Sequence, residues 1–250
     1  MRLLIVGYGF VGTATKYLFD KTKAGVFIHD PVKGYHNIGG KYDYIFLCVP
    51  TDLNLCTNRL NTYALKEAYD SWKHSGQIVI RSTIGPNQVK EFPDAIMMPE
   101  FLREKHWKED VDNPSLPLIV SDEDFALKLV DMFSEDGSCP PKRVFYAPPE
   151  EAAMFKLARN SALAMKVAIA NEFSEICESL NMDYTRIQLL LENDIAVGGS
   201  HWQVPGPDGC VGFGGKCLPK DLTHMQRMCY NTDNVFETAL RCNKRRRPFE

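Results

Sequence analysis

The chain has 250 residues, of which 44% are hydrophobic and 24% charged, and its formal net charge is −3. This length allows one large domain or two modest ones, and the weak negative charge gives no general attraction to nucleic acid. No apolar run approaches the roughly 20 residues that span a membrane, and Met1 and Arg2 lead directly into an apolar strand. We therefore expect no signal peptide, no membrane contact and a cytoplasmic location.

The first part of the chain alternates strands with helices. Apolar runs predict strands at residues 2–6, 26–29, 44–49, 77–81, 95–98 and 116–120, and helical spacing predicts helices at 10–19 and 63–73. This alternation indicates an α/β fold with a parallel, doubly wound sheet.

The pattern changes near Pro148 and Pro149. A long helix is predicted at 150–180, without internal proline or glycine, then helices at 184–193 and 220–246, with a loop rich in glycine and proline at 198–215 between them. The apolar positions spaced along one face of the long helix are Phe155, Ala158, Ala162, Met165, Ile169 and Phe173. An exposed face of this kind usually marks an interface, which predicts a homodimer.

Charge and cysteine patterns narrow the class of protein further. The C-terminal basic run (residues 244–247) is interpreted as a solvated helix end, with contact to phosphate or an acidic partner as the alternative. The 8 cysteines include no Cys-x-x-Cys pair, so no metal site is expected and reduced thiols are predicted. Cys48 and Cys177 lie in apolar segments and are predicted to be small core residues.

Gly7, Gly9 and Gly12 follow the first strand and open the first helix, as a dinucleotide-binding turn requires. The first glycine allows the tight turn, the second admits the pyrophosphate, and the third permits close packing of helix on strand. Asp30 lies 18 residues after Gly12 and can accept both ribose hydroxyls of NAD, although the nearby Lys33 leaves NADP open. We therefore predict a Rossmann domain that binds NAD over residues 1–148. The residues of the turn predicted to contact the cofactor are Gly7, Tyr8, Gly9, Phe10, Val11, Gly12 and Asp30.

Cys217 stands between a glycine-rich turn, Gly212 to Gly215, and the pair Lys220 and Asp221. Glycines let a backbone approach a ligand closely. A nearby ammonium favours the thiolate, the form of cysteine that attacks carbon. This spacing predicts covalent chemistry at the sulfur, in a helical domain over residues 149–250.

At this point the sequence resembles the UDP-glucose 6-dehydrogenase family, within the wider nucleotide-sugar dehydrogenases. The stretches that carry the likeness are residues 7–12, 81–83, 99–104, 156–160 and 212–221. The cysteine run and the Pro-Glu-Phe-Leu run are specific, whereas the glycine motif is shared by many dehydrogenases. The resemblance implies a Rossmann domain followed by an all-helical dimerisation domain.

The resemblance also implies a four-electron oxidation of the primary alcohol of a nucleotide sugar, most plausibly UDP-glucose, with two NAD and one water. Cys217 would hold the aldehyde as a thiohemiacetal and then as a thioester. Asp221 and Thr83 would position water, Lys156 and Asn160 would stabilise negative charge on oxygen, and Glu100 would assist hydrolysis.

Further contacts are implied by the same likeness. The cofactor would also contact Val49, Pro50, Thr51, Thr83, Glu104 and Lys220. The substrate would contact Glu100, Phe101, Leu102, Arg103, Lys156, Asn160, His201, Phe213, Gly214, Gly215 and Cys217.

Five of these residues also have a purely structural interpretation. Lys156 and Asn160 are four apart, as on a solvated helix face. Glu100 could be a turn residue, Asp221 a helix cap and Cys217 a core cysteine.

The chain departs from the family pattern in three places. Only 29 residues follow Asp221, so we expect a short form without the second nucleotide-binding domain that usually follows. His201 is the nearest candidate for an arginine that usually reaches the partner's sugar, and Lys216 stands where a small residue is usual. Three other hypotheses stay open: a non-catalytic NAD-binding homologue, a dehydrogenase of GDP-mannose or an N-acetylated UDP-sugar, and a single-hydride dehydrogenase of hydroxy acids.

Overall fold

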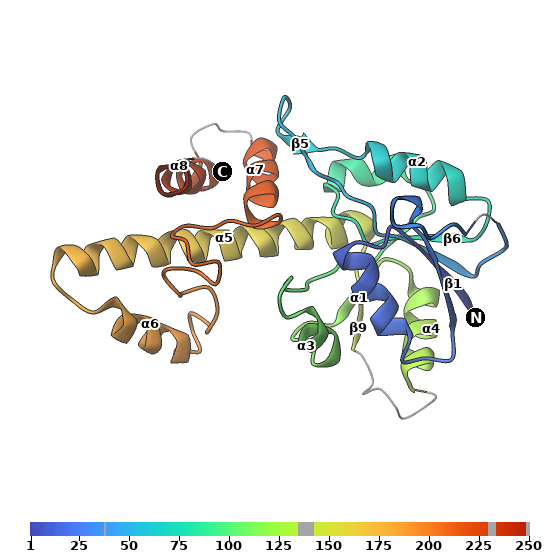
Figure 1. Cartoon of the computed structure of the whole chain (residues 1–250), viewed down its shortest axis with the longest axis horizontal. Coiled ribbons are helices and arrows are strands. Elements are labelled where there is room, and N and C mark those ends of the chain that lie inside the picture. The colour runs from blue at the N-terminus through green and yellow to red at the C-terminus, as the bar shows by residue number, and fades with distance from the viewer. Residues whose placement is uncertain (38, 135–142, 230–233, 249–250) are drawn as a thin grey trace. The chain divides into compact units, whose positions relative to one another are not determined.

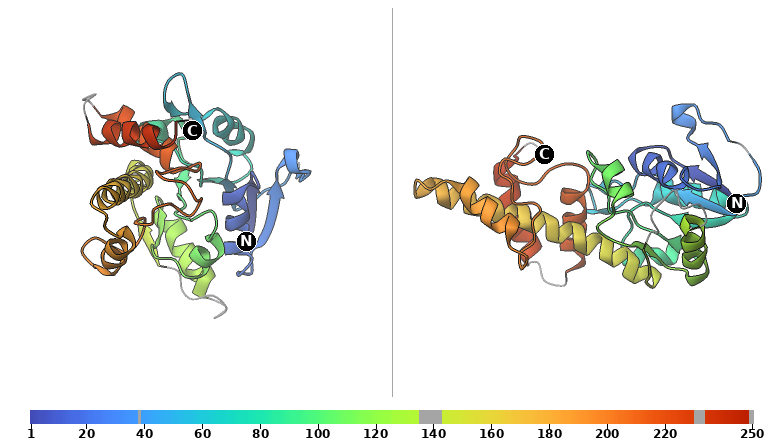
Figure 2. Two further views of the ribbon diagram at one scale, coloured as in Figure 1. Left: turned by 60° about the vertical axis from the view of Figure 1, so that its left-hand side comes forward. Right: turned by 90° about the horizontal axis from the view of Figure 1, so that it is seen from below.

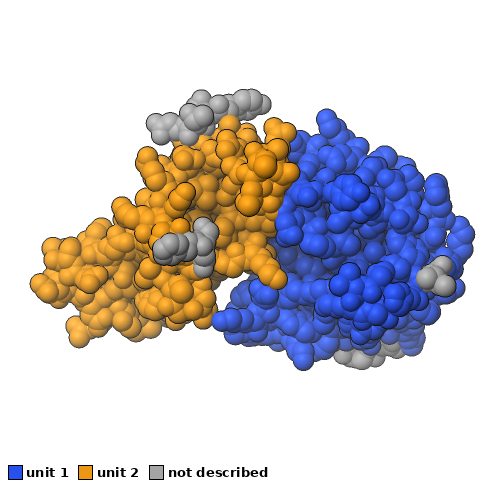
Figure 3. Space-filling view, turned by 45° about the horizontal axis from the view of Figure 1, so that its top comes forward, with its two compact units in different colours: residues 1–52, 60–156 blue, residues 53–59, 157–250 orange. Residues whose placement is uncertain are grey.

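The computed structural model describes residues 1–37, 39–134, 143–229 and 234–248, and every structural statement below concerns these residues. They form two compact units, residues 1–52 with 60–156 and residues 53–59 with 157–250 (Figure 3). The division at Lys156 falls inside a helix that begins at Pro149. Among the helices described, none combines the length and apolarity that a membrane span needs.

The first unit is built on a five-stranded sheet in the order β2-β1-β3-β6-β7 (Figure 1). Its strands are β1 (Arg2–Val6), β2 (Gly25–His29), β3 (Tyr44–Leu47), β6 (Gln77–Ile80) and β7 (Ile96–Met97). All four neighbouring pairs are parallel. Five of the six predicted strands therefore form this sheet.

Side chains of β1, β3, β6 and β7 alternate between two apolar cores, one on each face of the sheet. Leu4 of β1 packs with α2 (Tyr63–Trp72) on one face. Leu3 packs on the other face with α1 (Phe10–Phe19) and α4 (Glu123–Ser134). Because helices cover both faces, the sheet is doubly wound, as the alternation of strands and helices predicts.

The sixth predicted strand, at 116–120, does not join the five-stranded sheet. It is β8 (Leu118–Val120) and pairs in parallel with β9 (Val144–Tyr146) as a separate two-stranded ladder. β9 is too short to give a clear apolar signal in the sequence. The remaining elements of this unit that were not predicted are the helices α3 (Trp107–Asp112) and α4 and the 3₁₀ helices η1 (Pro31–Lys33) and η2 (Pro86–Glu91). A short hairpin, β4 (Leu53–Asn54) with β5 (Arg59–Leu60), belongs mostly to the second unit.

The second unit is helical. Its frame is the long helix α5 (Pro149–Ser179), followed by α6 (Tyr184–Asn193), and both match the predicted helices closely. α6 lies beside α5 (Figure 2), where Cys177 of α5 and Tyr184 of α6 pack in one core. A second core joins α5 to α7 (Leu218–Met228) and α8 (Val235–Arg246) through Ala164, Leu222 and Ala239.

The prediction of one helix over 220–246 is wrong. α7 ends at Met228, where Cys229 is extended (φ −70°, ψ 137°), and α8 starts after Asn234, whose side chain accepts a hydrogen bond from the Glu237 N–H. Asparagine at this position is a strong start signal for a helix. Residues 230–233 of the predicted helix lie outside the described residues.

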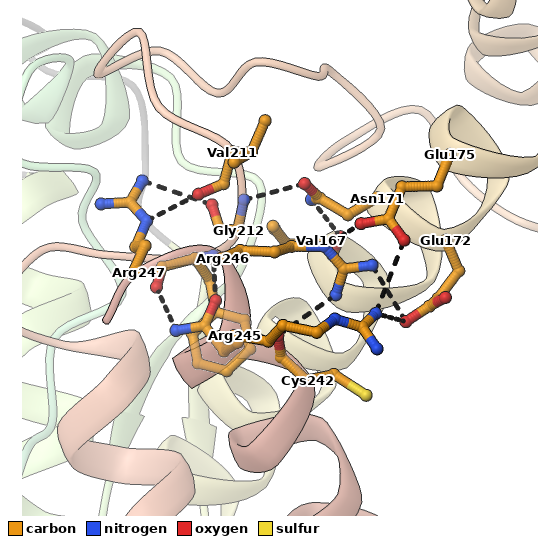
Figure 4. A network of polar contacts seen from close by, with 12 residues as sticks. Val167, Asn171, Glu172, Glu175, Val211, Gly212, Cys242, Arg245, Arg246 and Arg247 are labelled. Carbon is orange, nitrogen blue, oxygen red and sulfur yellow. Dashed lines mark hydrogen bonds and ion pairs between the residues drawn. The ribbon is translucent and has the colours of Figure 1, made fainter. Parts of the chain in front are cut away.

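The interpretation of the C-terminal basic run as a solvated helix end is also wrong in part. Arg246 forms ion pairs with Glu172 (2.9 Å) and Glu175 (2.7 Å) of α5, and its side chain is 5% exposed (Figure 4). Arg247 is equally buried and pairs with Asp208 at 2.5 Å. Acidic residues on neighbouring segments, which periodicity cannot locate, neutralise the run.

Candidate functional site

The glycine turn at the end of β1 has the strained geometry of a phosphate-binding turn. Gly7 has φ +87°, a conformation that favours glycine, and a Cβ there would lie 2.8 Å from the Cys48 carbonyl. A Cβ at Gly12 would collide with the Gly7 carbonyl. Gly9 is the N-cap of α1, and no described atom lies within 4 Å of the Cβ position there. The backbone at Gly9 is therefore open to close approach by a ligand at the positive end of α1.

Asp30 lies beside this turn, at the end of β2. Its Oδ2 accepts a hydrogen bond from the Tyr8 N–H at 2.7 Å, and its Oδ1 accepts one from the Lys33 N–H at 3.2 Å. The Lys33 ammonium donates to the Tyr8 carbonyl at 2.7 Å. The carboxylate that the sequence predicts as the ribose acceptor is thus fixed against the glycine turn.

The ends of β3 and β6 are tied together by side chains. The Thr51 hydroxyl donates to the Thr83 carbonyl at 2.7 Å, and the Ser82 hydroxyl donates to the Val49 carbonyl at 2.7 Å. Pro50, between them, is exposed. Carboxyl ends of parallel strands are where such folds bind ligands, so these predicted cofactor contacts lie at the expected edge of the sheet.

Glu100 and Lys156 form a buried ion pair. The two are 6% and 3% exposed, and the Lys156 ammonium donates to Oε1 and to the carbonyl of Glu100, both at 2.7 Å. The Leu102 N–H donates to Oε2 at 2.7 Å. Burial alone would raise the pKa of Glu100, but the ammonium and the N–H outweigh it and hold that pKa below its usual value. Glu100 is therefore an ionised, buried carboxylate and more than a turn residue.

Arg81 is a buried charge in the same unit whose importance the sequence did not reveal. It is 4% exposed, and its guanidinium donates to the Thr15 hydroxyl (3.2 Å) and the Met98 carbonyl (3.3 Å). Its charge also lowers the pKa of Glu100. The sequence signal that could have indicated this role is an arginine directly after an apolar strand.

Cys48 lies in the core of the same unit, as its apolar segment predicts. Burial raises the pKa of its thiol to about 11.

A second polar cluster lies in the helical unit. The Asn160 amide of α5 donates to Asp221 Oδ2 at 2.6 Å, and the Lys220 ammonium lies 3.2 Å from Oδ1. Asp221 is fully buried and Asn160 is 4% exposed. Cys217 holds the N-cap position of α7, so Asp221 is not the cap of that helix. Asn160 and Lys156 do not form a solvated helix face, since both are buried.

His224, one turn beyond Asp221 on α7, was not singled out in the sequence. It is 2% exposed, and neither ring nitrogen has a hydrogen-bond partner among the described residues. Burial lowers the pKa of His224, the Asp221 carboxylate opposes that effect, and Lys220 and Arg59 add to it. A lone histidine in a helical stretch gives no sequence signal that separates this environment from a surface one.

Cys217 itself is exposed, at the amino end of α7. The Asp221 N–H donates to its carbonyl at 2.9 Å, which closes the first turn. The preceding Gly215 has φ +78°. Negative charge is favoured at helix amino ends, so an exposed thiol at this position is suited to act as a nucleophile and is not a core cysteine.

Several predicted substrate contacts belong to neither of the two buried polar clusters described above. The exposed Arg103 forms ion pairs with Asp110 (2.6 Å) and Glu109 (3.2 Å), and Glu104 next to it is exposed. Phe101 is half-buried, with its ring 5.6 Å from the Lys156 ammonium. The remaining predicted contacts are Leu102 and Gly214, both half-buried, His201, half-buried with φ +70°, and Phe213, whose ring lies in the core of α5, α7 and α8.

The polar groups at the glycine turn fit a dinucleotide better than a metal ion. Within the described ranges, no group of three or more His, Cys, Asp or Glu side chains is arranged to hold a metal ion. Gly7, Gly9, Gly12 and Asp30 provide the open turn and the carboxylate that a dinucleotide requires.

Comparisons with known proteins agree with this arrangement. Residues 150–245 match the model of the central domain of the UDP-glucose/GDP-mannose dehydrogenase family. A UDP-glucose 6-dehydrogenase from Campylobacter jejuni is 25% identical over 100% of this chain and 73% of its own length. The chain spans between 30% and 73% of the length of the curated relatives that it matches.

Solved structures share the fold over nearly the whole chain. A UDP-glucose dehydrogenase from Pyrobaculum islandicum has a TM-score of 0.78 at 21% identity, covering 98% of this chain and 68% of that one. A UDP-D-ManNAc dehydrogenase from Pyrococcus horikoshii also has a TM-score of 0.78, at 18% identity, covering 100% of this chain and 69% of that one. Residues 150–245 therefore match the central domain of the UDP-glucose/GDP-mannose dehydrogenase family, and the chain as a whole is similar to nucleotide-sugar dehydrogenases in sequence and in fold.

Proposed function

We propose that this protein is an NAD-dependent nucleotide-sugar 6-dehydrogenase that oxidises UDP-glucose to UDP-glucuronate. The observation that carries the proposal is the exposed Cys217 at the amino end of α7, one turn before the buried, hydrogen-bonded Asp221. The match of residues 150–245 to the family model supports oxidation of a sugar alcohol, and the Cys217 thiol supports oxidation of the resulting aldehyde to the acid.

The cofactor would be held by the glycine turn and by Asp30. The N–H groups at the start of α1 would bind the pyrophosphate, and the Asp30 carboxylate would accept the ribose hydroxyls. When bound, NAD accepts a hydride from the carbon being oxidised. Thr51, Thr83 and Glu104 would complete the contacts at the carboxyl edge of the sheet.

The protein's own chemistry centres on the sulfur. The Cys217 thiolate adds to the aldehyde carbon and forms a thiohemiacetal, with the oxygen protonated by a neighbouring acid. That carbon would then give its second hydride to a second NAD while its hydroxyl gives a proton to a neighbouring base, which leaves a thioester. Water then adds to the thioester carbonyl, the carbon–sulfur bond breaks, and the carboxylate product leaves with the thiolate regenerated.

The buried polar residues supply the proton and charge handling. The Asn160 amide and the Lys156 ammonium are donors suited to a developing oxyanion, where each is worth more because water is excluded. Glu100 and Asp221 are buried acceptors suited to taking a proton from water. Lys220, beside Asp221, would pair with the thiolate or a phosphate.

UDP-glucose is proposed because the C. jejuni relative that covers the whole chain is a UDP-glucose 6-dehydrogenase. GDP-mannose and N-acetylated UDP-sugars are the competing substrates, since the family name includes the first and the P. horikoshii enzyme is named for the second.

We further propose a homodimer through α5. Ile169, Phe173 and Ile176 lie on one face of this helix and are 41%, 38% and 51% exposed. Three large apolar side chains at i, i+4 and i+7 form a stripe suited to packing against a second helix.

Absorbance of NADH during turnover tests the proposed function. Wild-type protein with UDP-glucose and NAD should release two NADH for each UDP-glucuronate formed, whereas a single-hydride dehydrogenase releases one. Cys217→Ala should show no steady-state turnover, while Cys210→Ala, an exposed cysteine in the preceding loop, should keep it. GDP-mannose and UDP-N-acetylmannosamine, assayed in parallel, identify the sugar.

Two results would contradict the proposal. Absence of NADH with every nucleotide sugar, from protein that still binds NAD, indicates the non-catalytic homologue. Full turnover by Cys217→Ala removes the thioester route.

A further inference from the structure

The peptide of Phe213, four residues before Cys217, is paired with one side chain from α8. The Phe213 N–H donates to Asn243 Oδ1 at 2.8 Å, and Asn243 Nδ2 donates to the Phe213 carbonyl, also at 2.8 Å. An asparagine amide has the same donor and acceptor as a peptide group. The Asn243 amide therefore makes the two hydrogen bonds to Phe213 that the backbone of a neighbouring β-strand would otherwise make.

The two residues before Phe213 are held in the same way. The Gly212 N–H donates to Asn171 Oδ1 of α5 at 2.8 Å. Arg247 donates to the Val211 carbonyl at 2.9 Å and to the Gly212 carbonyl at 3.3 Å (Figure 4). Five backbone groups of three successive residues are thus bonded to side chains of α5 and of the segment that ends α8. We call these three side chains, Asn171, Asn243 and Arg247, the loop clamp.

The loop clamp lies in a closely packed environment. Gly212 has φ +79°, and a Cβ there would lie 2.5 Å from Asn243 Oδ1, so the close approach requires glycine. The Phe213 ring is 2% exposed and anchors the loop in the core of α5, α7 and α8. Arg247 is 7% exposed, and Asp208 balances its charge at 2.5 Å. Asn171 and Arg247 of the clamp are therefore buried and Asn243 is half-buried, and each of the three is hydrogen-bonded to the loop.

Beyond the clamp the loop changes character. Gly215, Lys216 and Cys217 are exposed, and Gly215 has positive φ. A short exposed segment between two fixed points, the clamp and the first turn of α7, has few positions open to it. Displacement of a reacting group by about 1 Å can cost about 100-fold in rate.

We propose that Asn243 and Arg247 are positioning residues for the Cys217 thiol, acting through the backbone of residues 211–213. This inference rests on the proposed function for its catalytic consequence. The segment from Asn243 to Arg247 then has a role in the reaction that requires no contact with substrate: it holds the loop from which the Cys217 thiol projects.

Two variants of Asn243 test the inference, with Lys244→Ala as the matched control because Lys244 is the exposed neighbour on the same helix. Asn243→Ala removes both bonds to Phe213. Asn243→Asp keeps the acceptor for the Phe213 N–H but loses the donor to its carbonyl, and it carries the comparison if the alanine variant does not fold. Correct folding is established by circular dichroism and by the affinity for NAD.

The expected results separate positioning from general stability. Both variants should lower kcat with UDP-glucose about 10- to 100-fold and leave the KM for NAD within twofold. Hydrogen exchange of the Gly212 and Phe213 amides should quicken at least tenfold. Alkylation of Cys217 by iodoacetamide at pH 7 should slow at least threefold relative to Cys56, an exposed cysteine of the same unit, because the thiol spends less time at the amino end of α7.

The alkylation ratio is independent of turnover, so the two proposals can fail separately. If wild-type protein oxidises no nucleotide sugar but the ratio falls in both variants, the proposed function is wrong and the positioning role stands. If the ratio, the exchange rates and kcat all stay within twofold of wild type, the positioning role is overturned. An equal loss of kcat in Lys244→Ala overturns it as well.

Discussion

Lys156 is a charged residue whose partner decides its effect on stability. The ammonium is 3% exposed and bonded twice to Glu100, itself 6% exposed. Removing one member of a buried pair leaves the other charge without compensation, at a cost of about 3–5 kcal/mol. We expect Lys156→Met to lower the free energy of unfolding by that amount, measured by urea denaturation.

The double variant Glu100→Gln with Lys156→Met is the control for this prediction. It removes both charges, so it should recover most of the lost stability, since neutral replacements of buried ion pairs are often well tolerated. A double variant no more stable than Lys156→Met would show that the ion pair does not account for the loss.

For single residues, the sequence motifs indicated which side chains to expect at the site, but they did not indicate whether those side chains are buried or paired. Cys217, Glu100, Lys156, Asn160 and Asp221 were all selected from motifs. Their burial and pairing could not be predicted, because a lysine four residues from an asparagine has the same spacing on a buried helix face as on a solvated one. His224 and Arg81 show the same limit, since burial of a polar side chain depends on elements distant in sequence.

Among the elements, α5 carries the apolar face through which we propose that the chain forms a dimer. Ile176 is 51% exposed and shares a face with Ile169 and Phe173. We expect Ile176→Arg to convert the dimer into a monomer, because an arginine would have to be buried in an apolar helix interface. Light scattering after size-exclusion chromatography measures the mass.

Leu127→Arg is a suitable control, because Leu127 of α4 is 65% exposed but lies in the other unit and off this stripe. It should leave the mass unchanged. A wild-type protein that is monomeric at every concentration tested, or an Ile176→Arg variant that stays dimeric, would contradict the assignment of the interface.

The predicted boundaries of helices and strands agree with the structure where the local sequence signal is strong. α6 lies within the predicted 184–193, and the strands rich in Ile, Val and Leu were all found. Residues 220–246 contain no proline or glycine that would mark a break in the predicted last helix. The only local sign of a new helix is the cap at Asn234, a weaker signal than proline or glycine.

For the molecule as a whole, pH should control stability through two buried groups. The pKa values of His224 and Glu100 both lie below their usual values in the folded chain. The unfolded chain therefore binds protons first as pH falls, and stability is lost. We expect the free energy of unfolding to be constant between about pH 7 and pH 8, to decline as pH falls below about 6.5 through His224, and to decline again below about 4.3 through Glu100.

Urea unfolding from pH 8 to pH 3.5 measures both phases. His224→Leu should abolish the first decline and leave the second. A stability profile that stays level between pH 7 and pH 5 in the wild type would contradict the role given to His224.

The interruption between α7 and α8 has a consequence for how the cysteine loop could be altered at a distance. In one unbroken helix from Leu218, Asn243 would lie 25 residues further on, about 38 Å away along the axis at about 1.5 Å per residue. Instead, α7 ends, α8 begins after Asn234, and α8 packs against α7. Asn243 therefore bonds to the backbone of Phe213, which precedes α7. Substitutions near Asn234 that favour one continuous helix would move the Asn243 amide away from Phe213. They would therefore lower the reactivity of the Cys217 thiol without changing any residue near it.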